Sequence, residues 1–94
     1  MDARDKENFE ILIERGNIKI KRITSPKNFK SEIFIQEEDE WVMVIQGSAE
    51  LDIAGRKVKI SEGEHIFIPR KTYHQILKTS DEIETVWLAV YLSE

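Results

Sequence analysis

Short runs in which apolar and polar residues alternate recur along the chain. In residues 49–53, Ala49, Leu51 and Ile53 alternate with two acidic residues, a pattern typical of a half-buried β-strand. Similar apolar or alternating runs cover residues 9–14, 18–23, 33–36, 41–46, 57–60, 66–68, 74–79 and 83–92. Glycine, proline and asparagine separate the runs, as expected for turns. No window of about 11 residues carries the apolar spacing of an amphipathic helix, so helix is limited to a turn or two near the N-terminus.

The number and spacing of these runs predict the fold class. About eight or more short strands, with turn signals every 8–12 residues, favour an all-β protein built as an antiparallel sandwich or barrel. Residues 1–94 are expected to form one domain, because no linker or repeat divides the chain. Alternate strand positions face the same side of a sheet, so one set of aliphatic residues should form the core. This set is Ile33, Ile35, Val42, Val44, Leu51, Ile53, Val58, Ile60, Ile66 and Ile68.

Apolar residues also occupy the opposite face of several predicted strands. Trp41 and Trp87 are expected to pack on that outer face. A small antiparallel barrel with apolar residues on both faces often covers the second face by pairing with another copy. The sequence therefore predicts a homodimer.

Composition and charge exclude several classes of protein. Apolar residues make up 40% and charged residues 34% of the 94, which is typical of a globular domain. The 18 acidic residues outnumber the 14 basic ones and give a net charge of −4, which disfavours nucleic-acid binding. The longest apolar runs are far shorter than the roughly 18 residues of a membrane span, and residues 1–9 lack the apolar segment of a secretory signal. The lack of cysteine excludes disulfides and thiolate sites, so a cytoplasmic protein is expected.

Two motifs in the middle of the chain carry the first chemical information. Glu40 is followed by six residues and Gly47, and Gly63 by five residues and a proline, with His74 five positions further on. With both motifs in this order, residues 31–92 resemble a small single-domain cupin. The resemblance implies a double-stranded β-helix, or jelly-roll, barrel of about eight or more antiparallel strands. Gly47 is predicted to lie at a chain reversal with positive φ, where a β-branched residue would damage folding.

The resemblance also implies where a metal ion would bind. Metal-binding cupins place the pattern His-x-His three or four residues before the glutamate. The residues at those positions here are Ile33 and Ile35 if four residues intervene, or Phe34 and Gln36 if three intervene. Of the expected ligands only Glu40 and His74 remain, which is too few for a good first-row metal site. We therefore expect either no cofactor or one divalent metal ion held by Glu40 and His74.

The resemblance places the Glu40 and His74 side chains in one pocket, with Gln36 and Tyr73 as further candidates for its lining. Attraction between the Glu40 carboxylate and a neighbouring imidazolium would lower the pKa of Glu40. Three interpretations of this pair stay open. It is a structural contact that closes the barrel mouth, or part of a small-molecule pocket, or the remnant of a metal site.

Three functions follow from these interpretations. The first is a non-catalytic or metal-poor barrel that binds a small molecule or a partner protein, and the missing histidines support it. The alternative is a metal-dependent cupin enzyme of the dioxygenase, isomerase or decarboxylase type, which rests on Glu40, His74 and the resemblance. The third is a metal-free acid–base catalyst that uses His74 and Tyr73, as in the sugar epimerases among the cupins. The sequence leaves open whether the protein is an enzyme.

Overall fold

The computed structural model describes residues 6–93 and confirms the all-β class. The strands are β1 (Asn8–Arg15), β2 (Ile18–Ser25), β3 (Asp39–Gln46), β4 (Ser48–Ile53), β5 (Arg56–Ser61), β6 (His65–Ile68), β7 (His74–Thr79) and β8 (Thr85–Leu92). No helix occurs among the described residues. Residues 1–5, which belong to the segment without a secretory pattern, lie outside the described part of the chain, as does residue 94.

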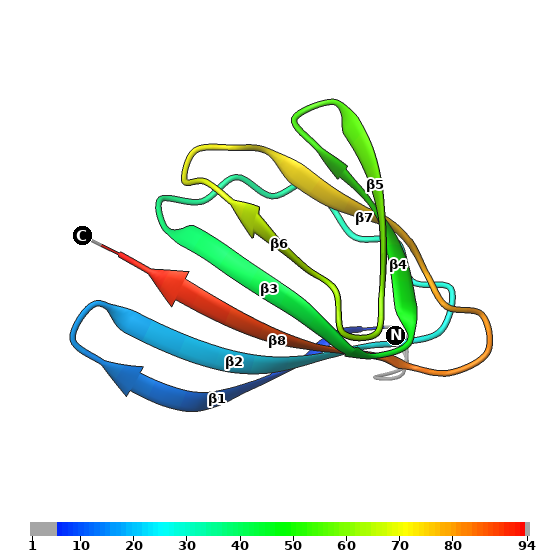
Figure 1. Ribbon diagram of the computed structural model, residues 1–94, viewed down its shortest axis with the longest axis horizontal. Coiled ribbons are helices and arrows are strands. Elements are labelled where there is room, and N and C mark those ends of the chain that lie inside the picture. The colour runs from blue at the N-terminus through cyan, green and yellow to red at the C-terminus, as the bar shows by residue number, and fades with distance from the viewer. Residues whose placement is uncertain (1–5, 94) are drawn as a thin grey trace.

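The strands form two antiparallel sheets that face each other (Figure 1). One sheet has five strands in the order β1-β2-β8-β3-β6, and the other has three in the order β5-β4-β7. The closed barrel expected from the sequence is not formed, because between residues 6 and 93 no ladder of strands joins the two sheets. Residues 33–36, predicted as a strand, contribute only an isolated antiparallel bridge between Phe34 and His74. The result is an open two-sheet structure with space between the sheets.

The core lies between the sheets and follows the alternation of each strand. Along β8 the burial pattern alternates at every position, with Thr85, Trp87, Ala89 and Tyr91 facing inward. The buried apolar residues are Ile23, Val42, Val44, Ala49, Leu51, Ile60, Ile68, Trp87, Ala89 and Tyr91. Five of these were predicted: Val42, Val44, Leu51, Ile60 and Ile68.

Two members of the predicted core set, and one residue predicted on the outer face, lie elsewhere than expected. Ile33 and Ile35 are 65% and 67% exposed, because the segment between β2 and β3 turns that side of the chain toward solvent. Trp87 was expected on the outer face, but it is buried between the sheets. The remaining predicted core residues, Ile53, Val58 and Ile66, are partly buried.

The outer face of the five-stranded sheet carries a row of apolar side chains that crosses every strand. Cross-strand pairs join Ile13 to Ile20, Ile20 to Val90, Val90 to Trp41, and Trp41 to Phe67. Directly opposite residues in a sheet share a face. This row, called the outer row below, faces away from the core, because the neighbouring positions along β3 and β8 face inward. Trp41 therefore lies on the outer face, as predicted.

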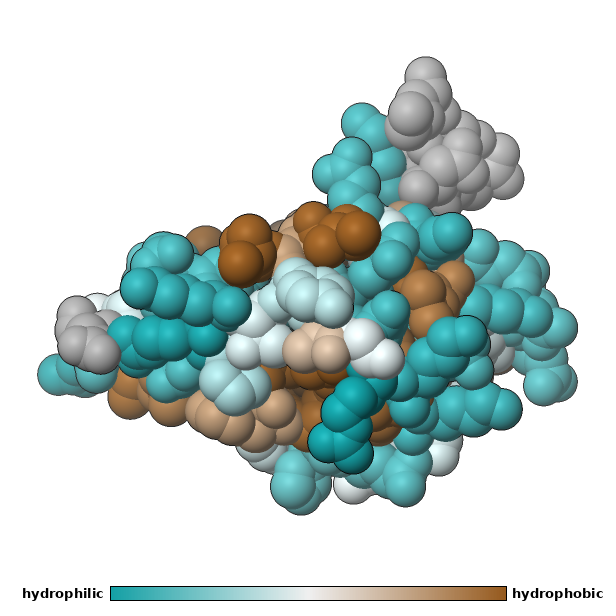
Figure 2. All heavy atoms as spheres, turned by 90° about the horizontal axis from the view of Figure 1, so that it is seen from above, coloured by the Kyte–Doolittle hydropathy of each residue, from teal (hydrophilic) through white to brown (hydrophobic). Residues whose placement is uncertain are grey.

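The face seen in Figure 2 is chemically mixed. Apolar side chains, drawn in brown, lie there in several groups separated by hydrophilic side chains drawn in teal. Within residues 6–93 the structure contains no helix of the length and apolar character that crossing a membrane requires.

Candidate functional site

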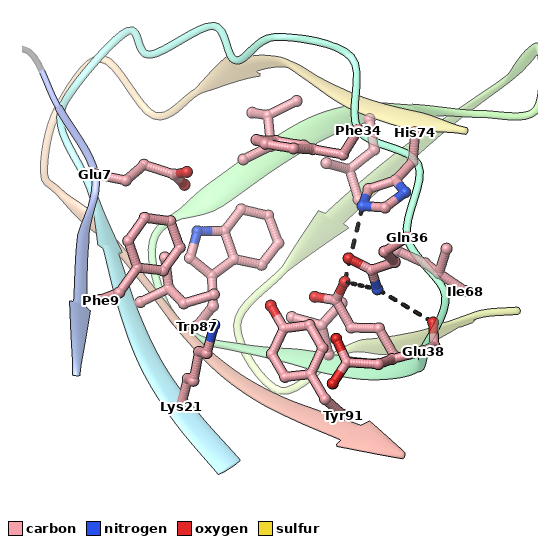
Figure 3. A pocket seen from close by; sticks show the side chains of 15 residues that line it. Glu7, Phe9, Lys21, Phe34, Gln36, Glu38, Ile68, His74, Trp87 and Tyr91 are labelled. Atoms are coloured by element: carbon pink, nitrogen blue, oxygen red, sulfur yellow. Dashed lines mark hydrogen bonds and ion pairs between the residues drawn. The ribbon is translucent and has the colours of Figure 1, made fainter. Parts of the chain in front are cut away.

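A cavity of about 290 Å³ lies between the two sheets. Its apolar lining consists of the aromatic residues Phe9, Phe34, Trp87 and Tyr91 and the aliphatic residues Ile23, Val42, Leu51, Ile68 and Ile76. Its polar lining consists of Glu7, Lys21, Gln36, Glu38, Glu40 and His74. In Figure 3 the labelled side chains point toward one common space, some from strands and others from the segments before β1 and between β2 and β3. Apolar walls with a few polar groups are typical of small-molecule sites.

Glu40 and His74 meet at one end of the cavity. Glu40 lies near the start of β3 in the larger sheet, and His74 begins β7 in the smaller sheet. Both are buried, with 7% and 9% of their surface exposed. The His74 Nε2 atom lies 3.7 Å from Glu40 Oε1, and Gln36 donates its amide N–H to the same oxygen at 3.0 Å. The two sheets and the segment between β2 and β3 therefore bring together three of the four side chains that the sequence proposed for a pocket, Glu40, His74 and Gln36.

The orientation of His74 is fixed by its surroundings. Its Nδ1 atom lies 3.2 Å from the carbonyl oxygen of Thr72, which can only accept, so Nδ1 is the protonated nitrogen in this contact. The backbones of Phe34 and His74 exchange two hydrogen bonds of 2.8 and 2.9 Å, and their ring centroids are 5.8 Å apart. As a result Nε2 is the nitrogen that faces Glu40.

The electrostatics of Glu40 differ from the sequence prediction. Burial raises the pKa of Glu40, because loss of hydration outweighs the lowering by His74, Gln36, Tyr91 and Lys21. Burial and the Glu40 carboxyl also raise the pKa of Tyr91, so its hydroxyl stays protonated and donates to Glu40. The end of the cavity is thus a desolvated carboxyl group surrounded by donors.

A second carboxyl group, that of Glu7, reaches the cavity from the segment before β1. Ser25 donates its hydroxyl to Glu7 Oε2 at 2.6 Å, and Trp87 donates its indole N–H to the Ser25 oxygen at 3.0 Å. Burial raises the pKa of Glu7, the Ser25 hydrogen bond partly offsets this, and the charge of Glu40 adds to the increase. Because the charge of Glu40 acts on Glu7, the two carboxyl groups are coupled across the cavity.

Lys21 supplies the cationic side chain of the lining. Its Nζ atom lies 4.8 Å from the centroid of the Tyr91 ring and 5.6 Å from that of Phe9. Both separations are within the range of cation–π attraction. The Lys21 ammonium is therefore held against aromatic faces at the rim of the cavity.

Two residues considered at the sequence level lie elsewhere. Tyr73 is 47% exposed and is not part of the cavity lining, and its hydroxyl lies next to Gly55 in the β4–β5 turn. His65 lies on the outer face of β6, where Trp41 donates its indole N–H to His65 Nδ1 at 3.1 Å. Neither side chain contributes to the group around Glu40.

The comparison with protein families identifies the chain. A family model described as a cupin domain matches residues 23–91, which is most of the sequence. The chain belongs to the cupin family. The matched segment begins within β2 and ends within β8, and it contains Glu40 and His74.

Solved structures resemble this cupin along nearly its whole length. A protein from Ralstonia eutropha JMP134 described as a candidate mannose-6-phosphate isomerase has a TM-score of 0.88 and 33% identity, covering 95% of this chain and 86% of that chain. The cupin domain of Cnp3 from Schizosaccharomyces pombe has a TM-score of 0.87 and 12% identity, with coverages of 94% and 65%. The polyketide cyclase RemF from Streptomyces resistomycificus has a TM-score of 0.80 and 23% identity, with coverages of 94% and 66%. No curated protein matches the sequence.

The structure decides which residues occupy the histidine positions of metal-binding cupins. Phe34 and Gln36 line the cavity beside His74, whereas Ile33 and Ile35 point to solvent, so three residues intervene before Glu40 and not four. Phe34 has no atom that can bind a metal ion, and Gln36, whose amide nitrogen donates to Glu40, could offer only a neutral amide oxygen, a poor ligand. Among residues 6–93, no three His, Cys, Asp or Glu side chains are grouped so that they could hold a metal ion. The cavity does not fit a first-row transition metal, which needs at least three good ligands.

Several lining residues were not singled out from the sequence. Trp87 and Tyr91 alternate with polar or outward positions along the last strand, and this spacing was a usable signal that they face inward. Lys21 lies two positions before the buried Ile23, so alternation also places it on the inner face. Glu7 gave no such signal, because it precedes the first strand and its place depends on the Ser25 contact.

Proposed function

We propose that this cupin binds a small organic molecule in the cavity between its sheets and does so without a first-row metal ion. The observation that carries the proposal is the lining itself. Aromatic and aliphatic walls surround a desolvated carboxyl, an imidazole and an amide, while Phe34 stands at a position where a metal-binding cupin has a ligand. Such a cavity can enclose an apolar body and hydrogen bond to a polar head.

The two enzymatic alternatives have less support. A metal-dependent dioxygenase, isomerase or decarboxylase would need ligands that Phe34 and Gln36 do not supply. The similarity to the Ralstonia eutropha protein supports the fold and the family, and a fold alone does not transfer an activity. Acid–base catalysis by His74 and Tyr73 would need both side chains in the cavity, and Tyr73 lies outside it.

Ligand binding can be followed with the tryptophan that lines the cavity. The chain has two tryptophans, so Trp41→Phe leaves Trp87 as the single emitter without touching the cavity lining. We expect a screen of sugars, organic acids, alcohols, amines and aromatic compounds to contain ligands that change Trp87 fluorescence. The same ligands should raise Tm, since a ligand at 100 times its Kd stabilises a folded protein by about 2.7 kcal/mol.

A variant that fills the cavity provides the control. Ile76 lines the cavity and is partly buried, so Ile76→Phe adds volume inside it. The variant should keep its fold and lose most of the response of Trp87 to the ligand. Equal responses in both proteins, or responses that appear only after a transition metal is added, would contradict the proposal.

We also propose that the outer row is the contact surface of a homodimer. Within residues 6–93 no other element covers this face, and Ile13 and Phe67 are 52% and 53% exposed. The row crosses all five strands of the sheet, and a typical interface buries about 800 Å² per partner. A second copy of the same sheet offers a matching flat apolar face, since a two-fold contact uses the same surface on both chains.

Sedimentation equilibrium tests this proposal. We expect a mass of two chains of 11.0 kDa each for the parent protein and a single-chain mass for Phe67→Glu, which places a charge in the outer row. Ile35→Glu is the matched control, because Ile35 is also apolar and exposed but lies in the segment between β2 and β3, outside the strands of this sheet. A monomeric parent protein, or a Phe67→Glu variant that remains dimeric, would rule out this interface.

A further inference from the structure

We propose that the cavity selects small organic cations, in which a primary ammonium group is attached to a short apolar body. The inference rests on the proposed function, because it names the chemical class of ligand for the same cavity. Three independent features of the lining support it: the balance of charge, the placement of the carboxyl groups and the aromatic faces.

The charges of the lining favour a cation. Three glutamates, Glu7, Glu38 and Glu40, line the cavity against one lysine, Lys21, and one histidine, His74. An anionic ligand would meet this acidic excess, and like charges repel most strongly where burial has removed water, as it has around Glu40. A cationic ligand would instead reduce the repulsion that the carboxyl groups exert on one another.

The carboxyl groups are placed on different walls of the cavity. Glu7 enters from the segment before β1, and Figure 3 shows it across the cavity from Gln36 and His74, the residues that contact Glu40. The charge of Glu40 nevertheless raises the pKa of Glu7, so the two groups influence each other through the space between them. A ligand in that space can approach either carboxyl group with its polar head.

The aromatic walls suit the same ligand class. Phe9, Phe34, Trp87 and Tyr91 line the cavity, and the faces of such rings attract ammonium groups. The protein already contains one example, because the Lys21 ammonium lies 4.8 Å from the Tyr91 centroid and 5.6 Å from the Phe9 centroid. This contact shows that a primary ammonium group is accommodated at the rim of the cavity.

The size of the cavity sets the probe. An apolar cavity of about 150 Å³ accepts a benzene molecule, so the cavity of about 290 Å³ has room for a benzyl group and a small head. Benzylamine, benzyl alcohol and benzoate have nearly the same shape and differ in charge. Titrating the Trp41→Phe protein with each of them compares a cation, a neutral molecule and an anion at one site.

We expect benzylamine to bind about tenfold more tightly than benzyl alcohol, which corresponds to one charge-assisted contact, and benzoate to bind most weakly. Glu7→Gln keeps the shape and the Ser25 contact while it removes the charge, so it should weaken benzylamine about tenfold and leave benzyl alcohol nearly unchanged. Glu38→Gln provides a second charge-removing variant in case Glu7→Gln does not fold.

Lys21→Met is the most discriminating variant. The Lys21 ammonium group occupies the aromatic rim, and its charge, which lowers the pKa of Glu40, offsets part of the negative charge of the carboxyl groups. Lys21→Met removes this group, so the affinity for benzylamine should increase. A cavity built for anions would show the opposite change, because Lys21 would then be the main attractive group. The direction of the effect therefore separates the two ligand classes.

The outcomes also separate this inference from the proposed function. If benzyl alcohol or benzoate binds more tightly than benzylamine, and Ile76→Phe abolishes that binding, the cavity is a ligand site and the preference for cations is wrong. If benzylamine binds equally well to Ile76→Phe, it binds outside the cavity and the inference fails. If none of the three probes changes Trp87 fluorescence or Tm, the cation inference is overturned, and the wider ligand screen decides the proposed function.

Discussion

The double substitution Phe34→His/Gln36→His is expected to turn the cavity into a transition-metal site. Both positions lie beside the two groups that can already act as ligands: Phe34 is 5.8 Å from His74 between ring centroids, and Gln36 Nε2 is 3.0 Å from Glu40 Oε1. Two further imidazoles would complete a set of three nitrogen ligands and one carboxylate. We expect the affinity for Zn²⁺ or Ni²⁺ to increase by at least about a thousandfold, because two protein ligands are too few and four are sufficient.

Competition with a chelating dye measures this affinity, and elemental analysis gives the number of ions per chain. Ile33→His/Ile35→His is the matched control, with the same two substitutions shifted by one residue. Those side chains are exposed, so the control should bind no more tightly than the parent protein. A metal site in the shifted variant and not in Phe34→His/Gln36→His would show that four residues intervene before Glu40 after all.

The sequence alone could not predict whether three or four residues separate the histidine positions of metal-binding cupins from Glu40. Ile33, Phe34 and Ile35 are consecutive apolar residues, so alternation cannot say which of them faces inward. The register is set by the backbone bridge between Phe34 and His74, two residues that are 40 positions apart. Such a contact requires the tertiary structure. The resemblance to cupins placed Glu40 and His74 in one pocket, because both match positions of the family's two motifs, and both line the cavity.

The direction in which the pKa of Glu40 shifts was also not predictable from the sequence. From the sequence, His74 was the one recognisable neighbour of Glu40, so attraction was expected to dominate. In the structure the strands β2, β3, β7 and β8 together exclude water from this carboxyl group, and the loss of hydration becomes the largest effect. Desolvation depends on all the residues that surround a group, so a pair of motif residues cannot predict it.

The strands were easier to predict than their closure into a barrel. Alternation and turn residues are local signals, and they located all eight strands, with a ninth predicted run at residues 33–36 that forms only a bridge. Closure depends on whether that run pairs along its length with a neighbour. Its outward isoleucines and its single bridge leave the two sheets unjoined there, and this opening gives the cavity its space.

Gly47→Ala is expected to destabilise the protein by about 3–5 kcal/mol, because it combines backbone strain with overpacking. Gly47 has a φ of +88°, which side chains other than glycine rarely adopt. A Cβ atom at this position would lie 2.6 Å from Thr85 Oγ1, 3.0 Å from Thr85 Cα and 3.1 Å from the Glu84 carbonyl oxygen. Two of these three atoms belong to the backbone, so they cannot move aside without shifting the start of β8.

Gly63→Ala separates the two contributions. Gly63 has a similar φ of +83°, but a Cβ atom there would meet nothing within 4 Å. It should therefore cost only the backbone strain, about 1–2 kcal/mol. Urea unfolding of the three proteins measures the difference, and equal losses in the two variants would show that contact with Thr85 contributes nothing. Thr85 is fully buried and donates its hydroxyl to the Ser48 carbonyl at 2.9 Å, so a shift at Gly47 would also disturb the junction of β4 and β8 that holds the sheets together at this end.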